Sequence, residues 1–165
     1  MSTQGPPPER PSVDPDVCLS VPAQRAEMSG AGKWRVLAVV AAGGAAGSAA
    51  RYAATLAVPA AEGGFPWAVF AVNVTGCALI GVLMVLTAER GRITHPLVRP
   101  FLGVGVLGGF TTFSTYAAGV SDLLVRQEVA TATAYTAVTA VAALAAVWGA
   151  AVLTRALAAG TGRTG

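Results

Sequence analysis

Charged residues are scarce in this sequence, and their scarcity sets its class. Only 12% of the 165 residues are charged and 54% are hydrophobic, whereas a soluble domain carries about twice that charged share. A single charge, Arg51, interrupts the block 36–61, and none occurs in 63–88, 100–121 or 129–154. Each block exceeds the roughly 20 residues that a helix needs to cross a bilayer, and the strict alternation of a transmembrane β-barrel is absent. We therefore expect an all-α integral membrane protein with four transmembrane helices.

Residues used in catalysis are equally scarce. The chain has one histidine, His95, and two cysteines, Cys18 and Cys77, whose positions do not suggest a disulfide or a metal site. It contains no phosphate-binding Gly-Lys-Ser/Thr run and no carboxylate pair. We therefore expect a protein that is not an enzyme. The net charge of +3 is better explained by membrane topology than by a nucleic-acid partner.

The predicted organisation is one membrane domain between two tails. Residues 1–32 hold six of the ten prolines, charges of both signs and no apolar run, a composition typical of disorder. They do not resemble a secretory signal, because no apolar segment follows the charges. We expect residues 1–32 and 158–165 to be disordered and residues 33–157 to form the four-helix domain.

Lysine and arginine fall mainly on one side of the four-span arrangement. The opposite side carries Glu62 in one loop and Asp122, Arg126 and Glu128 in the other. Because basic residues near span ends favour the cytoplasmic side, we expect both termini of this copy in the cytoplasm. The seven basic residues on that side are Lys33, Arg35, Arg90, Arg92, Arg99, Arg155 and Arg163.

Small residues recur at four-residue spacing in the first and third spans. This spacing lets helix backbones approach closely in membranes, and we expect it to serve packing, above all in the first span. The pairs are Gly43 with Gly47, Gly44 with Ser48, and Gly105 with Gly109.

Two polar side chains within the spans each have two interpretations. Arg51, in the outer half of the first span, either snorkels to the interface or provides a fixed positive charge that attracts anions or anchors a loop. Asn73, in the middle of the second span, either hydrogen-bonds a neighbouring helix or offers an amide donor to an anion. Polar groups inside a bilayer are energetically unfavourable, so each needs a partner or a function.

The third span contains an unusual segment, Gly103–Tyr116. The adjacent Gly108 and Gly109 precede four hydroxyl residues within five positions, and both features disfavour an uninterrupted helix. We therefore expect a break in this helix. Non-helical backbone at membrane depth is tolerated only where protein buries it or a water-filled cavity meets it, and freed carbonyls there would suit a hard cation.

Aromatic and hydroxyl residues accompany this segment. Phe113 and Tyr116 share a helical face, where they either pack or line an anion path with the electropositive edges of their rings. On the fourth span, a stripe either donates hydrogen bonds along a conduit or mediates helix pairing. This stripe consists of Thr131, Tyr135 and Thr139. Four helices are few for a solute pathway, so a pore would need a second subunit.

Together these motifs resemble the CrcB/Fluc family of fluoride channels over about residues 36–154. The resemblance rests on three segments in the same order and spacing, of which the last is the most specific. They are Gly43–Gly47 leading to Arg51-Tyr52, Asn73–Gly76 with Gly81, and Gly108–Tyr116. The resemblance implies a fluoride-selective channel in a bacterial cell membrane, which passively exports fluoride and lowers its toxicity.

The resemblance also implies an antiparallel, dual-topology dimer with two fluoride pores along the subunit interfaces. It implies a structural sodium ion, Na+, at the centre of the dimer, held by Gly108 and Thr111. Asn73 would supply the pore amide, and Phe113 with Tyr116 the paired aromatic rings. Nearby hydroxyls would come from Ser114, Thr115, Tyr135 and Thr139.

Two features depart from the family pattern. Phenylalanine is usual at the position of Tyr116, and the added hydroxyl would change ion coordination or permeation rate. The marked charge bias differs from that of homodimeric members, which insert in both orientations, and is similar to that of members that occur as oppositely oriented partners. We therefore expect a second, homologous subunit of opposite bias.

Two alternatives come from other classes of protein. A small proton-coupled drug exporter also has four helices, but it needs a carboxylate within the membrane. Every Asp and Glu here falls in a tail, in a loop or at a span end, which argues against an exporter. A membrane scaffold, whose glycines and hydroxyls serve packing only, predicts that Asn73→Asp and Phe113→Ile alter stability without changing ion flux.

Overall fold

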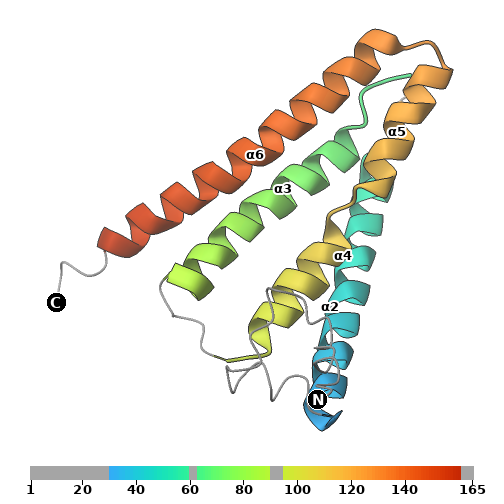
Figure 1. Ribbon diagram of the computed structural model, residues 1–165. Helices are drawn as coiled ribbons and strands as arrows, with labels where there is room; N and C mark the ends of the chain where they lie inside the picture. The colour runs from blue at the N-terminus through green and yellow to red at the C-terminus, as the bar shows by residue number, and fades with distance from the viewer. Residues whose placement is uncertain (1–29, 60–62, 90–94, 161–165) are drawn as a thin grey trace, which may run out of the picture. The chain divides into compact units, whose positions relative to one another are not determined.

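The computed structural model describes residues 30–59, 63–89 and 95–160 of the chain, which falls into two units, 1–35 and 36–165. Most of the two predicted tails lies outside the described residues. The charged residues Glu62, Arg90 and Arg92 lie wholly outside them. The helices (Figure 1) are, in chain order, α2 (Gly30–Ala57), α3 (Trp67–Met84), η1 (Val85–Glu89), η2 (Arg99–Leu107), α4 (Gly108–Phe110), α5 (Ser114–Val125) and α6 (Val129–Gly160).

The helices make up four segments that are long and apolar enough to cross a membrane. Among the described residues these segments are Gly32–Ala57, Trp67–Thr87, Arg99–Val125 and Val129–Ala159. The prediction of an all-α membrane protein with four spans is therefore confirmed. Pro66, which has no amide hydrogen to leave unpaired, directly precedes the first residue of α3.

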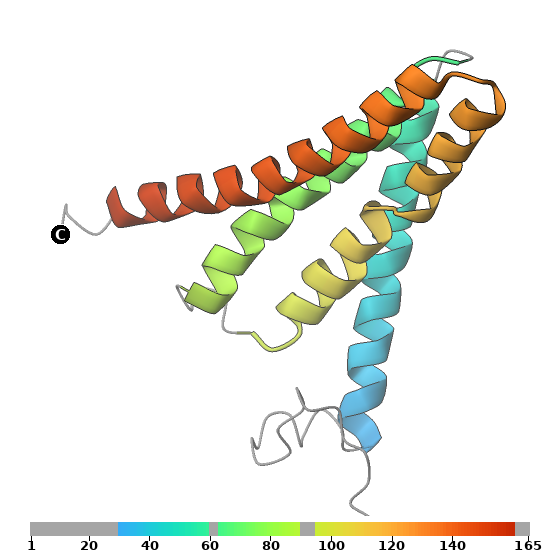
Figure 2. The ribbon, with the colours of Figure 1, turned by 45° about the horizontal axis from the view of Figure 1, so that its top comes forward.

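Helices α3 and α6 run alongside each other over most of their length (Figures 1 and 2). Helix α5 packs on α6 through a small core in which Leu123, Ala132 and Tyr135 are buried. The turn between these two helices is closed by Gln127, whose φ of 63° is left-handed, and by a hydrogen bond from the Glu128 amide to the Leu123 carbonyl. This small core therefore lies near the turn that joins α5 to α6.

Glycines bring α2 against the third span backbone to backbone. A Cβ atom on Gly43 would lie 2.6 Å from the Phe101 carbonyl oxygen and 3.0 Å from the Cα of Gly105. A Cβ on Gly47 would collide with the Val106 carbonyl, and one on Gly109 with the carbonyl of Gly44. The close packing predicted from the four-residue spacing is therefore present.

The third span is not a uniform α-helix. Its first part, η2, has the wide turns of a π-helix, and α4 follows with Gly108 in ordinary helical geometry (φ −65°, ψ −35°). Thr111 is then extended (φ −73°, ψ 156°), and α5 begins at Ser114. The non-helical stretch therefore contains Thr111 and Thr112, Ser114 and Thr115 begin α5, and the two glycines precede the stretch.

Candidate functional site

The side-chain amide of Asn73 on α3 hydrogen-bonds to the non-helical stretch of the third span. Its Nδ2 donates to the carbonyl oxygen of Thr112 at 3.0 Å, and its Oδ1 accepts from the Thr112 amide at 2.9 Å. A backbone that leaves its helix inside a membrane must find such partners, because no water replaces the lost hydrogen bonds. Asn73 therefore links α3 to the third span through hydrogen bonds. Its second amide hydrogen has no acceptor among the described residues.

The buried hydroxyl of Thr112 organises the start of α5. Its Oγ1 accepts from the Thr115 amide at 3.1 Å, as an N-capping side chain does. The same oxygen lies 3.0 Å from Thr115 Oγ1 and 3.3 Å from Ser114 Oγ. Arg51 of α2 donates from Nη1 to Thr115 Oγ1 at 3.4 Å, so its side chain contacts the hydroxyl cluster. Thr112 was not predicted as a site residue, and only the fold shows that it joins the predicted ones.

Two backbone carbonyls are left without donors by this arrangement. The Thr112 amide, which would bond to the Gly108 carbonyl in a continuous helix, goes to Asn73 instead. The Thr111 hydroxyl and amide both donate back to the Leu107 carbonyl at 2.9 Å. Within the described part of the chain, the carbonyl oxygens of Gly108 and Thr111 accept no hydrogen bond. These are the kind of oxygen ligand that a hard cation prefers.

Three aromatic rings follow one another beside the hydroxyl cluster. The ring centroids of Phe113 and Tyr116 are 5.9 Å apart, and those of Tyr116 and Tyr135 are 5.1 Å apart, with tilted planes in both pairs. Phe113 is 80% exposed, whereas Tyr135 is fully buried. The Tyr116 hydroxyl donates to the Thr136 carbonyl on α6 at 3.3 Å, so this hydroxyl ties its ring to the neighbouring helix.

A cleft of about 440 Å3, here called the polar cleft, brings several predicted residues together. The polar, thiol and aromatic residues of its lining are Asn73, Cys77, Thr111, Thr112, Phe113, Tyr116 and Thr139. Ser114 and Thr115 are linked to it through hydrogen bonds of Thr112, while Gly108, Tyr135 and Arg51 do not line it.

Three buried side-chain donors of the described residues lack partners, and one of them borders the polar cleft. Among buried side-chain atoms of the described residues, Arg51 Nε, Tyr135 Oη and Thr139 Oγ1 have no hydrogen-bond partner. Thr139 is only 5% exposed and borders the polar cleft. Buried polar groups are nearly always satisfied, so unpartnered donors in this region indicate a place for an acceptor such as an anion.

The fold and the site together define a multi-span membrane protein with a polar and aromatic cleft at the interruption of one span, an arrangement suited to passage of a small ion. Residues 38–151 match the family model described as "CrcB-like protein, Camphor Resistance (CrcB)". The chain therefore belongs to the CrcB family, as its motifs predicted.

Curated relatives agree with this assignment. The chain is 54% identical over 126 residues to the fluoride-specific ion channel FluC 1 of Streptomyces coelicolor, covering 74% of this chain and 81% of the relative. It is 51% identical over 124 residues to FluC 2 of Streptomyces avermitilis, covering 75% and 77%. It is also 50% identical over 102 residues to FluC 2 of Nocardia farcinica, covering 62% and 72%.

Proposed function

We propose that this chain forms a fluoride-specific ion channel that passively exports fluoride across the cell membrane. The observation that carries the proposal is the polar cleft beside the non-helical stretch, bordered by the buried Thr139 hydroxyl that has no partner among the described residues, in a chain whose relatives are named fluoride-specific channels. Fluoride is small and strongly hydrated, so its water shell must be replaced by several weak donors that also let it leave. An inside-negative membrane potential favours exit of each anion by about 2.3 kcal/mol per 100 mV.

The donors fall into three chemical kinds along the cleft. The second amide hydrogen of Asn73 remains after the Thr112 contact, and the hydroxyls of Ser114, Thr115, Tyr135 and Thr139 lie nearby. The rings of Phe113 and Tyr116 present electropositive edges. Arg51 supplies positive charge at the hydroxyl cluster through its contact with Thr115. Together these groups supply the hydrogen bonds and positive potential that water would otherwise provide to the anion.

Fluoride efflux from liposomes tests the proposal, with chloride as the control ion. Phe113→Ile removes an aromatic side chain that is 80% exposed, so we expect it to abolish fluoride flux and to leave stability unchanged. Trp148→Ile is the matched control, because Trp148 is 71% exposed and does not line the polar cleft. Loss of stability with unchanged flux in Phe113→Ile would favour the scaffold alternative.

The carbonyls of Gly108 and Thr111 support a structural sodium site as part of the proposal. Both oxygens accept no hydrogen bond among the described residues, and Na+ would supply positive charge that stabilises the interrupted backbone. We expect thermal stability of the purified protein to fall when Na+ is replaced by N-methylglucamine. Equal stability in the two salts would contradict the sodium site.

The polar cleft supports a dimer, since one chain leaves it open and leaves Phe113 80% exposed. A second subunit of antiparallel orientation would close the pathway. The basic bias of one side orients this copy with both termini in the cytoplasm, so the proposed partner is a homologous chain of opposite bias. Cysteine accessibility at both termini in intact cells tests the orientation. Mixed orientations, with fluoride flux from this chain alone, would contradict the paired-subunit proposal.

The drug-exporter alternative lacks a chemical basis in the described residues. Asp122 is the only carboxylate within the four spans in this part of the chain. Its side chain is 60% exposed near the end of α5, where it pairs with Arg126 at 2.9 Å. A carboxylate in that position does not exchange protons at membrane depth.

A further inference from the structure

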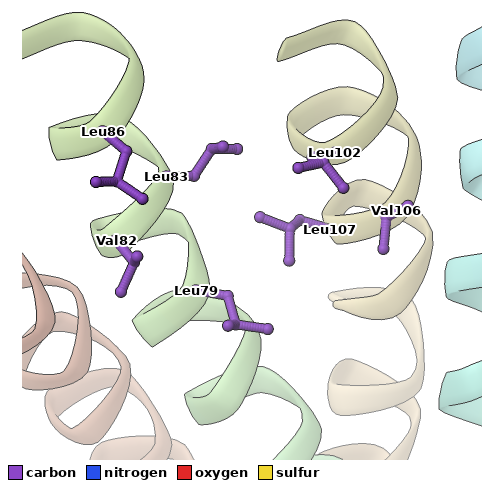
Figure 3. A pocket seen from close by; sticks show the side chains of 7 residues that line it. All are labelled: Leu79, Val82, Leu83, Leu86, Leu102, Val106 and Leu107. Carbon is purple, nitrogen blue, oxygen red and sulfur yellow. The ribbon is translucent and has the colours of Figure 1, made fainter. Parts of the chain in front are cut away.

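A second cleft lies between the second and third spans, away from the polar cleft. It has a volume of about 260 Å3 and is called here the apolar cleft (Figure 3). One wall comes from Leu79, Val82 and Leu83 of α3 with Leu86 of η1, and the other from Leu102, Val106 and Leu107 of η2. Figure 3 shows Leu79 and Leu83 directed toward η2 and Leu107 directed toward α3 across the space between the two helices. No polar side chain contributes to the lining.

The apolar cleft is separate from the polar one. On α3, the polar cleft is lined by Asn73, Cys77 and Ile80, whereas the α3–η1 wall of the apolar cleft lies between residues 79 and 86. At about 100° per residue, the two sets are centred roughly 140° apart around the helix axis. A subunit that closes the polar cleft would therefore approach a different side of α3, and the apolar cleft is left to another occupant.

The helices are locally unwound where they form this cleft. Four of its seven lining residues belong to the π-helical segments η1 and η2. Such wide turns are rare and frequently mark functional sites. Gly103, within η2, contributes to the opening because it has no side chain; a Cβ there would meet Leu83 Cδ2 at 3.5 Å. The backbone itself, as well as the choice of side chains, therefore creates the space.

One end of the apolar cleft carries a positive charge. Arg99 is exposed and begins both η2 and the third span, three residues before Leu102 of the cleft lining. Residues 79 to 86 cover about 10 Å along the helix, within the roughly 15 Å depth of one hydrocarbon leaflet. An apolar groove of this depth beneath a cationic side chain at the membrane surface fits one acyl chain below an anionic headgroup.

We propose that the apolar cleft binds an anionic phospholipid, with an acyl chain between η2 and α3 and the headgroup phosphate at Arg99. Lipid is the occupant that the surroundings favour, because the lining is wholly apolar and the segment lies within predicted membrane spans. Arg99 selects for a negatively charged headgroup, because a basic residue near the membrane surface attracts anionic lipid. The proposal does not depend on which ion the protein conducts.

Native mass spectrometry of the delipidated, full-length protein tests the proposal with equimolar phosphatidylglycerol and phosphatidylcholine. We expect the wild type to retain phosphatidylglycerol preferentially, and Arg99→Gln to lower that preference about fivefold, which corresponds to one basic residue. Arg35→Gln is the matched control, because it removes an exposed arginine at the predicted same side of the membrane. Equal retention of the two lipids by the wild type would overturn the proposal.

A second pair of variants tests the cleft itself. Gly103→Leu places a side chain toward Leu83, where a Cβ has ordinary contact distance, so folding is preserved while the cleft is filled. Gly149→Leu on α6 is the control, since no atom lies within 4 Å of a Cβ there. We expect only Gly103→Leu to lose bound lipid, with both thermal midpoints near that of the wild type. Unchanged lipid retention in Gly103→Leu would overturn the proposal, as would loss of dimer without loss of lipid, which would identify a second copy as the occupant.

Discussion

The two halves of the third span are stabilised within the membrane in different ways. Its first half meets α2 through glycines, with backbone against backbone, and the Ser48 hydroxyl of α2 donates to the Gly109 carbonyl at 3.4 Å. Its second half leaves the helix at Thr111 and depends on Asn73, Thr112 and Thr115 for hydrogen bonds. The comparison teaches that close packing suffices where the helix is intact, whereas polar side chains gather where the backbone is exposed. Substitutions in each half are expected to fail in different ways.

The largest expected effect on stability belongs to the glycine half. Gly47→Ala places a Cβ against the Val106 carbonyl and 2.9 Å from the Phe110 amide nitrogen, both of which are backbone atoms that cannot rotate away. We expect the free energy of unfolding to fall by about 3 kcal/mol, measured by denaturation in detergent micelles. Gly44→Ala is the control, because nothing lies within 4 Å of its Cβ. Equal stability of the two variants would disprove the close packing.

The next effect belongs to the polar half. Asn73→Ala removes two hydrogen bonds to Thr112, which is buried, and leaves the backbone amide and carbonyl of Thr112 unpaired. We expect a loss of about 2 kcal/mol in the same denaturation assay, together with loss of fluoride flux. Asn73→Asp retains an acceptor for the Thr112 amide but loses the donor to the Thr112 carbonyl and places a carboxylate within the membrane, so it should also be destabilised and impermeable. A conducting Asn73→Ala channel would remove Asn73 from the proposed pathway.

A smaller effect is expected at Tyr116, whose hydroxyl bonds to α6. Tyr116→Phe keeps the ring contacts with Phe113 and Tyr135 and loses one hydrogen bond, to the Thr136 carbonyl. We expect stability to fall by about 0.6 kcal/mol and fluoride selectivity to persist, as measured by paired fluoride and chloride efflux. Loss of selectivity in this variant would show that the hydroxyl contacts the ion instead of anchoring the ring.

The smallest effect is expected at the far end of the second half, at the exposed pair of Asp122 and Arg126. Their side chains are 60% and 45% exposed, and the 2.9 Å contact joins residues one helical turn apart. Asp122→Asn should change the free energy of unfolding by only about 0.3–0.5 kcal/mol, and less at high salt. A change as large as that of Asn73→Ala would mean that the pair is part of the core architecture.

The fold was largely predictable because the bilayer imposes a simple rule. Four long apolar blocks, interrupted only by Arg51, predict four helices, and the structure has them. The boundaries differ where local chemistry overrides hydropathy: α6 continues beyond Thr154 to Gly160, because a membrane helix extends into the interface. The glycine spacing of Gly43 and Gly47 also predicted the packing correctly, since a four-residue repeat marks a helix face directly.

The site was predictable only in part. Asn73 and the Thr-Thr-Phe-Ser-Thr segment were recognisable as unusual polar residues in a membrane span, and both border the polar cleft or bond to it. Their pairing was not predictable, because 39 residues separate Asn73 from Thr112 and no periodicity reports which helices meet. Thr112 was overlooked for the same reason. The apolar cleft had no signal at all, since its leucines and valines resemble any other lipid-facing residues.

By itself the sequence determined that this protein is helical, membrane-spanning and a member of the CrcB family, because length, hydropathy and motif order are local properties of the chain. Tertiary structure alone decided that Asn73 takes the place of the lost helical hydrogen bonds at Thr112 and that the carbonyls of Gly108 and Thr111 accept no hydrogen bond from the residues that the structure describes. It also decided that the Tyr116 hydroxyl anchors its ring to α6. These outcomes depend on which groups meet across helices, and in a membrane every polar group must find its partner there or remain available to an ion.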